Sequence, residues 1–225
     1  MIKNWKVTAR LSSPLAGKPP KLDAVLEWEL SKRLGYKQGF KLTRDIPLSE
    51  VKRVPIPLAQ RTIGGRDIYC CSDPIMPEAN AEWVEHLSKR IDTGLFVQLL
   101  APEEWKAIGT TSGPYKMRYA PVQVRLIDRV CWFVRGDRKE ISKLLKSVFA
   151  IGQYRKIGYG IIGKWEFEET EDDNSIFAER DGKKVLMKTI PAGNLEKAEG
   201  YTLSFGGAAP PYWHPENTME IAIPC

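Results

Sequence analysis

The sequence predicts an α+β fold, in which helices and strands follow one another in mixed order. Three observations carry this prediction: a strand–helix unit over residues 5–35, a second over residues 121–150, and a glycine-rich segment that leads into a further strand. The chain has 225 residues. That length is sufficient to bury a core without disulfides or metal ions.

The first unit begins with the alternating segment WKVTARL. Its apolar residues occupy one face of a half-buried strand; they are Trp5, Val7, Ala9 and Leu11. A turn rich in serine, proline and glycine follows, and then apolar residues recur at helical spacing; they are Leu22, Val25, Leu26 and Leu30. Lys32 and Arg33 suit the last turn of this helix, and Gly35 suits its C-terminal cap.

Residues 36–120 form a long insertion that prolines interrupt repeatedly. Residues 51–60 and 66–76 are predicted to be strands, and ANAEWVEHLSKRI (79–91) a helix with Trp83 or Val84, Leu87 and Ile91 turned inward. GTTSGPYKMRYAP (109–121) is typical of an exposed loop. Irregular insertions of this length often carry a function.

The second unit follows this insertion. Residues 122–134 predict a strand, and Asp137 is placed to cap a helix over 138–150. The apolar stripe of that helix is Ile141, Leu144, Leu145, Val148 and Phe149. Further strands are predicted at 161–169, with Ile161, Trp165 and Phe167 on one face, in a hairpin that turns at Asp181 and Gly182, and at 219–225.

Charge is distributed unevenly along the chain. Residues 1–165 contain 29 Lys and Arg against 16 Asp and Glu, a net charge of +13, whereas residues 166–225 contain 5 against 12, a net charge of −7; together they give +6. A basic segment of this size attracts phosphate backbones. The acidic run EFEETEDDNS (166–175) either faces a basic neighbour or keeps a strand edge solvated.

The four cysteines are Cys70, Cys71, Cys131 and Cys225, and their spacing indicates neither a disulfide framework nor a zinc site. We expect no metal and no cofactor. No apolar run approaches the length of a membrane span, and the N-terminus lacks the apolar core of a signal peptide, so we expect a cytoplasmic protein with no membrane contact.

The segment GQYRKIGYGIIGK (152–164) satisfies two nucleotide-binding spellings, G-x-G-x-x-G and G-x-x-x-x-G-K. Both motifs require a strand to enter the glycine turn and a helix to leave it, so that the helix N-terminus faces the phosphate. Here the predicted order is helix, glycines, strand. Trp165 also occupies the position where a P-loop has Ser or Thr. We therefore do not expect a mononucleotide site.

The same segment combines glycines, cations and tyrosines, which suit a single-stranded nucleic-acid backbone. Glycines allow a close approach of the backbone, Arg155, Lys156 and Lys164 supply charge, and Tyr154 and Tyr159 supply flat surfaces. The alternative is that the glycines permit tight helix-to-strand packing and the tyrosines are core. The residues alone leave both interpretations open.

The order of these elements resembles the RAMP superfamily of CRISPR-associated proteins, which have ferredoxin-like, RRM-like cores. SSPLAGKPPKLDAVLEWEL and IGQYRKIGYGIIGKW are similar to the type IV effector subunit that is related to the crRNA-capping, five-prime-handle-binding RAMP of type I systems. The resemblance covers roughly half of the chain. It implies one RAMP domain over 1–225, with 1–35 and 121–225 as the core, hairpin and tail, and 36–120 as a thumb-like insertion.

The resemblance also implies a non-catalytic role in which the protein binds the 5′ handle of crRNA and contacts a backbone RAMP subunit and a large subunit. Target DNA would be reached through the complex, mainly by guide pairing, with loops such as 61–75 or 105–120 available for a flanking motif. The expected RNA contacts are Gly152, Tyr154, Arg155, Lys156, Gly158, Tyr159, Gly160, Gly163, Lys164, Lys116, Arg118 and Tyr119.

Two alternatives remain open. Related RAMP proteins include metal-independent endoribonucleases that use histidine; here His214, expected to be exposed in the loop PPYWHPEN, is the candidate catalytic residue. His86 is expected to be structural, beside the apolar stripe of the predicted helix 79–91. The other alternative is a protein-interaction scaffold without RNA contact, in which the basic segment faces an acidic partner.

Overall fold

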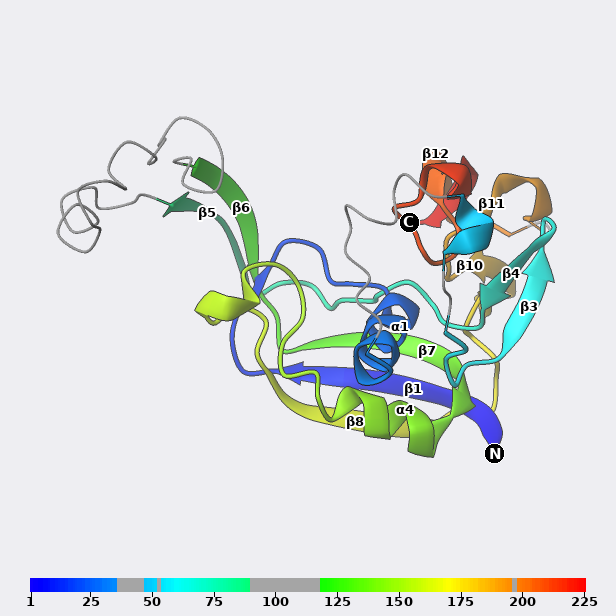
Figure 1. Cartoon of the computed structure of the whole chain (residues 1–225), viewed down its shortest axis with the longest axis horizontal. Helices are drawn as coiled ribbons and strands as arrows, with labels where there is room; N and C mark the ends of the chain where they lie inside the picture. Colours follow the sequence, from blue (N-terminus) through cyan, green and yellow to red (C-terminus); the bar gives the residue numbers. More distant parts are fainter. Residues whose placement is uncertain (36–46, 52–53, 90–117, 196–197) are drawn as a thin grey trace, which may run out of the picture.

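The computed structural model describes residues 1–35, 47–51, 54–89, 118–195 and 198–225 (Figure 1). The described chain contains two α-helices and many strands, which confirms the α+β class. The single-domain assignment, with residues 36–120 as an insertion, stays a prediction.

The central sheet has three antiparallel strands in the order β7-β1-β8. They are β1 (Ile2–Leu11), β7 (Arg129–Asp137) and β8 (Ile162–Glu169). The outer edge of β7 is met by isolated antiparallel bridges from Leu58, Cys71 and Ile75. As the sequence predicts, Trp5, Val7 and Ala9 of β1 are buried. Their face of the sheet is therefore the core face.

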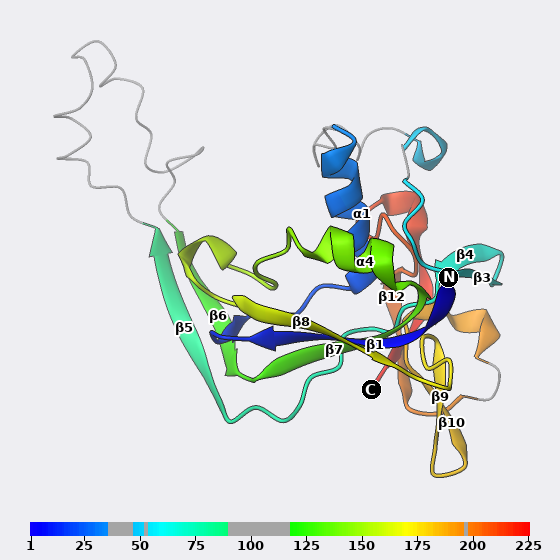
Figure 2. The same ribbon diagram turned by 90° about the horizontal axis from the view of Figure 1, so that it is seen from below.

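Two helices cover that face: α1 (Leu22–Arg33) and α4 (Arg138–Leu145) (Figure 2). Asp137 caps α4 as predicted, because its carboxylate accepts hydrogen bonds from the amides of Lys139 (2.9 Å) and Glu140 (3.3 Å). The core joins α1, α4 and the sheet, and includes Leu26, Trp132 and Ile141.

The helix predicted over 138–150 is shorter than expected. Because α4 ends at Leu145, Phe149 lies beyond its last turn and is 74% exposed, so its place in the apolar stripe was wrong. The single strand predicted over 122–134 is divided into two strands in the structure, β6 (Arg118–Leu126) and β7. Asp128 lies in the turn between them.

A two-stranded arm projects from the core (Figure 1). It consists of β5 (Ala81–Lys89) and β6, paired antiparallel, and the short β2 (Leu15–Ala16) pairs with the root of β6. The prediction of a helix over 79–91 was therefore wrong. The backbone bonds of β5 are made with residues far along the chain, which local spacing does not reveal.

The remaining strands form smaller sheets beside the core. They are β3 (Gln60–Ile63), β4 (Arg66–Tyr69), β9 (Phe177–Arg180), β10 (Lys183–Leu186), β11 (Ile190–Pro191), β12 (Tyr201–Gly207) and β13 (Thr218–Pro224). The β9–β10 hairpin turns at Asp181 and Gly182, both with positive φ, as predicted. Short 3-10 helices span Leu48–Glu50, Arg155–Ile157, Ala192–Asn194 and Pro215–Asn217.

A buried ion pair joins α1 to the C-terminal part. Lys188 Nζ lies 2.8 Å from Asp23 Oδ2, and both side chains are fully buried. The Tyr212 hydroxyl donates to the same carboxylate oxygen at 2.5 Å. Burial alone would raise the pKa of Asp23, but Lys188 and Tyr212 outweigh it and hold that pKa below its ordinary value.

Cys70, Cys71 and Cys131 are buried and unbonded to one another, and Cys225 is exposed. Burial, aided by Asp23, raises the pKa of Cys71 to about 12, which keeps this thiol protonated at neutral pH. Among the described residues, no group of three or more His, Cys, Asp and Glu side chains is placed to hold a metal ion. None of the described helices has the length and apolar character needed to cross a membrane.

Candidate nucleic-acid interface

The glycine-rich segment lies between α4 and β8, in the order that the sequence predicts. Tyr154 has a left-handed backbone (φ 53°), Arg155–Ile157 form one 3-10 turn, and Gly158 ends it at φ 100°. No helix N-terminus follows the glycines, since the chain passes directly into β8. This geometry does not provide the phosphate cradle of a mononucleotide site.

Residues 13–17 support this segment through hydrogen bonds. The amide of Gln153 donates to the carbonyl of Ala16, and the amide of Gly160 donates to the carbonyl of Pro14, both at 2.8 Å. The amide of Ile161 donates to the Ser13 hydroxyl at 2.8 Å. These bonds join both ends of the basic turn to the chain that forms β2.

Two glycines are required by this close packing. A Cβ at Gly160 would lie 1.9 Å from the Ile151 carbonyl oxygen, and one at Gly152 would lie 2.7 Å from the Ala16 carbonyl oxygen. Both residues also have positive φ. Gly163 differs, because the nearest atom to an added Cβ is 3.7 Å away and its φ is not positive. The contact role expected of these three glycines stays a prediction.

The cations of the turn lie at the surface of the protein. Arg155 and Lys156 are exposed, and neither forms an ion pair with another described residue. Tyr154 is 38% and Ile157 61% exposed beside them. Residues 152–157 together line a shallow hollow. The structure thus brings two cations without ion-pair partners among the described residues together with one tyrosine on a hydrogen-bonded turn.

Lys164 is not available in the same way. Its Nζ lies 3.2 Å from Glu166, which also accepts a 2.8 Å bond from Arg10 Nε. The hydrogen bond from Arg10, followed by that from Lys164, lowers the pKa of Glu166. Lys6 and Lys3 pair likewise with Glu168 (3.3 Å) and Glu169 (2.5 Å). The acidic run therefore faces basic neighbours within the chain.

Tyr159 also differs from the expected flat, open surface. It is only partly exposed and packs against a small cluster at the root of the arm, formed by Ala16, Val122 and Val124. Of the two tyrosines, one is presented to solvent and the other joins the turn to the arm. The packing interpretation therefore applies to Tyr159, and the contact role of Tyr154 stays a prediction.

The arm carries a second aromatic surface. Tyr119 is 67% exposed, and its ring stacks on His86 at 5.0 Å between centroids and 11° between planes. His86 is itself exposed on β5, so its expected place beside an apolar helix stripe was wrong. Arg118 is the first residue of β6, but its side chain lies outside the described residues, as does the whole of Lys116.

His214 is not the exposed residue that the nuclease alternative needs. Its exposed fraction is 2%, and its Nδ1 accepts a hydrogen bond from the amide of Glu216 at 3.2 Å. This bond caps the 3-10 turn Pro215–Asn217. The expectation of exposure failed because this loop, although rich in proline, folds back over the C-terminal core.

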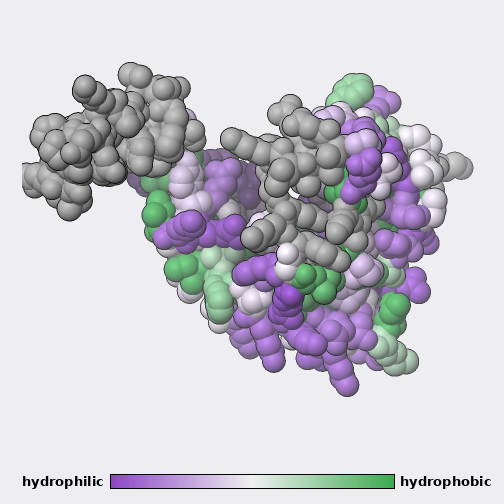
Figure 3. Space-filling model, in the orientation of Figure 1, coloured by the Kyte–Doolittle hydropathy of each residue, from purple (hydrophilic) through white to green (hydrophobic). Residues whose placement is uncertain are grey.

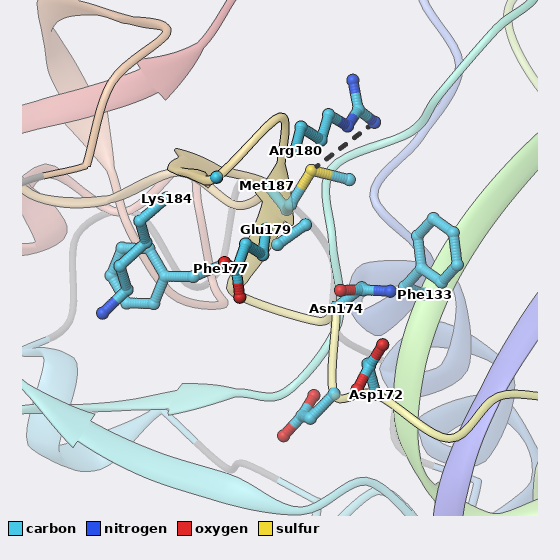
Figure 4. Close-up of a pocket in the computed structure, with 11 residues that line it drawn as sticks. Phe133, Asp172, Asn174, Phe177, Glu179, Arg180, Lys184 and Met187 are labelled. Atoms are coloured by element: carbon cyan, nitrogen blue, oxygen red, sulfur yellow. Dashed lines mark hydrogen bonds between the residues drawn. The ribbon is translucent and has the colours of Figure 1, made fainter.

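An acidic cleft lies between β7 and the β9–β10 hairpin (Figure 4). Phe133 and Phe177 line it together with Asp172, Asp173 and Glu179, and its cations are Arg180 and Lys184. None of the predicted RNA contacts lines this cleft. Its excess of carboxylates opposes a phosphate backbone, so the basic turn remains the better interface.

The face seen in Figure 3 is mostly hydrophilic over the described core. In a comparison with family models, the model of CRISPR type IV associated protein Csf3 matches residues 70–224. The chain belongs to the Csf3 family. This makes it a type IV CRISPR-associated protein, and the family implies a subunit of a type IV CRISPR effector. A search of curated proteins finds no match.

The Csf3 match includes β5–β6, the glycine-rich turn and the C-terminal strands, and leaves out β1 and α1. Sequence reasoning missed the part of this Csf3-family chain that supports the turn. Ser13, Pro14 and Ala16 were treated as a plain turn between strand and helix. The signal available was the run of Ser, Pro and Gly itself, which marks a segment whose backbone groups need partners elsewhere.

Proposed function

We propose that this Csf3-family protein is a non-catalytic subunit that binds crRNA at its 5′ handle. The observation that carries the proposal is the braced turn with Arg155 and Lys156 exposed and Tyr154 beside them. Because backbone hydrogen bonds support the turn, its backbone needs little further ordering when the two cations bind a phosphate backbone, and an exposed ring accepts a stacked base.

A ferredoxin-like, RAMP-type core is part of this proposal. It is supported by the antiparallel order β8-β1-β7 with residues 71–75 bridging the outer edge of β7. The two helices that follow β1 and β7 lie on one face, as a βαββαβ core requires. The β5–β6 arm then corresponds to the thumb-like insertion.

The arm extends the proposed RNA path. Tyr159 packs where the turn meets the root of β6, so the basic turn and the arm are continuous. The Tyr119–His86 stack lies farther along β5–β6. We assign to it the stacking of unpaired handle bases, while the turn holds phosphates. A backbone RAMP subunit, a large subunit and target DNA are the proposed partners of the assembled complex.

The proposal is tested by the RNA content of the effector purified with all of its subunits. We expect Arg155→Ala with Lys156→Ala to reduce the small RNA that copurifies. The control is Arg61→Ala with Lys139→Ala, which removes the same charges from exposed positions on β3 and α4. Equal RNA content in the two variants would overturn the proposed role of the turn.

The nuclease alternative predicts metal-independent cleavage of a repeat RNA by the isolated protein. Because His214 is buried and caps a turn, we propose no catalytic role for it. Cleavage that survives His214→Ala but not Tyr119→Ala would transfer the site to the arm.

The scaffold alternative predicts unchanged RNA content after loss of Arg155 and Lys156.

A further inference from the structure

The edge strand β12 differs from the other sheet edges in having no charge. It pairs with β13 on one side, and no other described strand pairs with its outer edge. Every other described edge strand of four or more residues carries at least one charged side chain, whereas β12 (YTLSFGG) carries none. It also has no proline, and its register with β13 is regular. Charges, prolines and bulges normally keep an edge from pairing with another chain, so this edge is open to strand addition.

The pairing with β13 determines which backbone groups of β12 face outward. The amide of Cys225 donates to the carbonyl of Gly200 at 2.9 Å. Backbone bonding alternates along an antiparallel pair, so the even-numbered residues of β12, such as Ser204, direct their amides and carbonyls to β13. The odd-numbered residues, among them Leu203 and Phe205, direct theirs outward. An incoming strand can bond to these groups without breaking the β12–β13 pairing.

Two large apolar side chains stand on the same strand. Leu203 is 56% exposed and Phe205 is 77% exposed. They are two residues apart, so they lie on one face of the sheet. Exposed apolar patches on a folded protein often mark an interaction site. Alternate residues of an added strand would cover both side chains, which is the usual source of specificity in strand addition.

One carboxylate indicates the charge of the partner. Glu220 on β13 is directly opposite Phe205, is exposed, and forms no ion pair with another described residue. It is the only charged residue in β12 and β13. A Lys or Arg on the added strand, opposite Phe205, would cover the exposed ring and extend toward the carboxylate.

Other occupants match this edge less well. A phosphate backbone would find no cation on β12 or β13 and would meet the Glu220 carboxylate. A second copy of this chain, pairing through its own β12, would bring no cation either. A basic strand from a different chain supplies both the backbone groups and the charge.

We infer that the outer edge of β12 accepts an extended strand of another effector subunit, with an apolar residue opposite Leu203 and a Lys or Arg opposite Phe205. This inference goes beyond the proposed RNA binding and uses different residues. The edge lies at the end of the molecule opposite the arm (Figure 1). The added strand would therefore leave the basic turn and the arm uncovered.

The test is photocrosslinking in the effector purified with all of its subunits. The photoreactive residue p-benzoylphenylalanine replaces Phe205, and mass spectrometry identifies the cross-linked segment. We expect a segment of another subunit in which a Lys or Arg lies two residues from an apolar residue. A cross-link to RNA, to a second copy of this chain or to a segment without that pattern would overturn the inference, as would the absence of any cross-link.

Two proline variants test the backbone pairing. Leu203→Pro removes an amide that points away from β13, and edge strands accept proline at such positions, so we expect the fold to be kept. The cross-link at position 205 should fall at least about fivefold, because an outward hydrogen bond is lost. Ser204→Pro instead removes an amide bonded to β13, and its melting temperature should fall by several degrees. An undiminished cross-link in folded Leu203→Pro would contradict strand addition.

Glu220→Gln keeps the test decisive if Leu203→Pro fails to fold. This exposed side chain makes no ion pair with a described residue, so the variant should be as stable as wild type. Loss of an exposed charge pair should weaken the cross-link about 2- to 5-fold at low salt and have little effect at high salt. An equal yield at low salt would contradict the basic character assigned to the partner.

Discussion

The amide of Gln153 donates a 2.8 Å hydrogen bond to the carbonyl of Ala16, which ties the basic turn to the strand that pairs with the arm. The Gln153 side chain also occupies the space where a Cβ at Gly17 would lie, 2.7 Å from its Cδ. The proposed RNA surface is therefore built across segments distant in sequence, and its order depends on that contact.

Gly160→Ala is expected to destabilise the protein. Its left-handed backbone costs a non-glycine residue about 1–3 kcal/mol, and the contact with the Ile151 carbonyl adds to this cost. The melting temperature is expected to fall by several degrees. Gly163→Ala is the matched control, since its Cβ has room; equal melting temperatures for the two variants would contradict the packing described for Gly160.

The turn cations are expected to act on phosphates. For single strands, the slope of log K against log salt concentration changes by about 0.7 for each phosphate contact. Arg155→Ala with Lys156→Ala should therefore make the slope less steep by about 1.4 when a handle RNA is titrated at several salt concentrations. Weaker binding with an unaltered slope would assign the loss to folding rather than to phosphate contact.

The exposed ring of Tyr119 is expected to stack on a base. Base stacking on an aromatic side chain contributes about 1–3 kcal/mol, so Tyr119→Ala should weaken handle RNA binding about 5- to 150-fold. Tyr119→Phe keeps the ring and should retain most of the affinity. If both variants lose affinity equally, the hydroxyl rather than the ring makes the contact.

Asp23→Asn is expected to be strongly destabilising, by about 3–5 kcal/mol, because it leaves the buried Lys188 ammonium without its partner. Asp23→Asn with Lys188→Met removes both charges and should recover part of the loss. Denaturant unfolding measures both variants. A double variant no more stable than Asp23→Asn would show that the unpaired charge is not the cause.

The pH dependence of this pair has a defined sign. Burial alone would lower the pKa of Lys188, but Asp23 outweighs it and raises that pKa above 10.5. The contribution of Lys188 to wild-type stability is complete below pH 10.5. It is lost as pH rises through the higher pKa that Lys188 has in the folded protein. The contribution of Asp23 is complete above about 3.8 and is lost as pH falls through its lowered folded value.

In Asp23→Asn, the pH dependence that Lys188 contributes to stability is expected to reverse its sign. Burial then lowers the pKa of Lys188, so the unfolded chain binds more protons and stability rises with pH toward 10.5. The difference in the free energy of unfolding between the variant and wild type should therefore become smaller as pH rises toward 10.5. The nearby groups Lys21, Asp73, Cys71 and Tyr212 are shared by both proteins. A deficit that is constant with pH would contradict this reversal.

Local rules in the sequence predicted the elements that local bonds determine. The alternation of Trp5, Val7 and Ala9, the Asp137 cap and the Asp181–Gly182 turn each depend on neighbouring residues, and each appears in the structure. The helix–glycine–strand order was predicted for the same reason, and it is the order found in the structure.

Long-range contacts account for the errors. Trp83 and Leu87 lie at helical spacing, yet β5 is a strand because β6, about forty residues along the chain, supplies its backbone partners. His214 is buried because its loop folds over the C-terminal core, and Tyr159 packs because the arm root reaches it. No local pattern encodes which distant segment covers a residue.

The pairing of β8 with β1 has a consequence for the electrostatic field around the protein. Glu166, Glu168 and Glu169 neutralise Arg10, Lys6 and Lys3 on adjacent strands, so these cations contribute little field at a distance. Arg155 and Lys156 have no ion-pair partner among the described residues, so their electrostatic field is not neutralised in this way. Under the proposed function, an approaching RNA strand would thus be attracted toward the turn rather than the sheet.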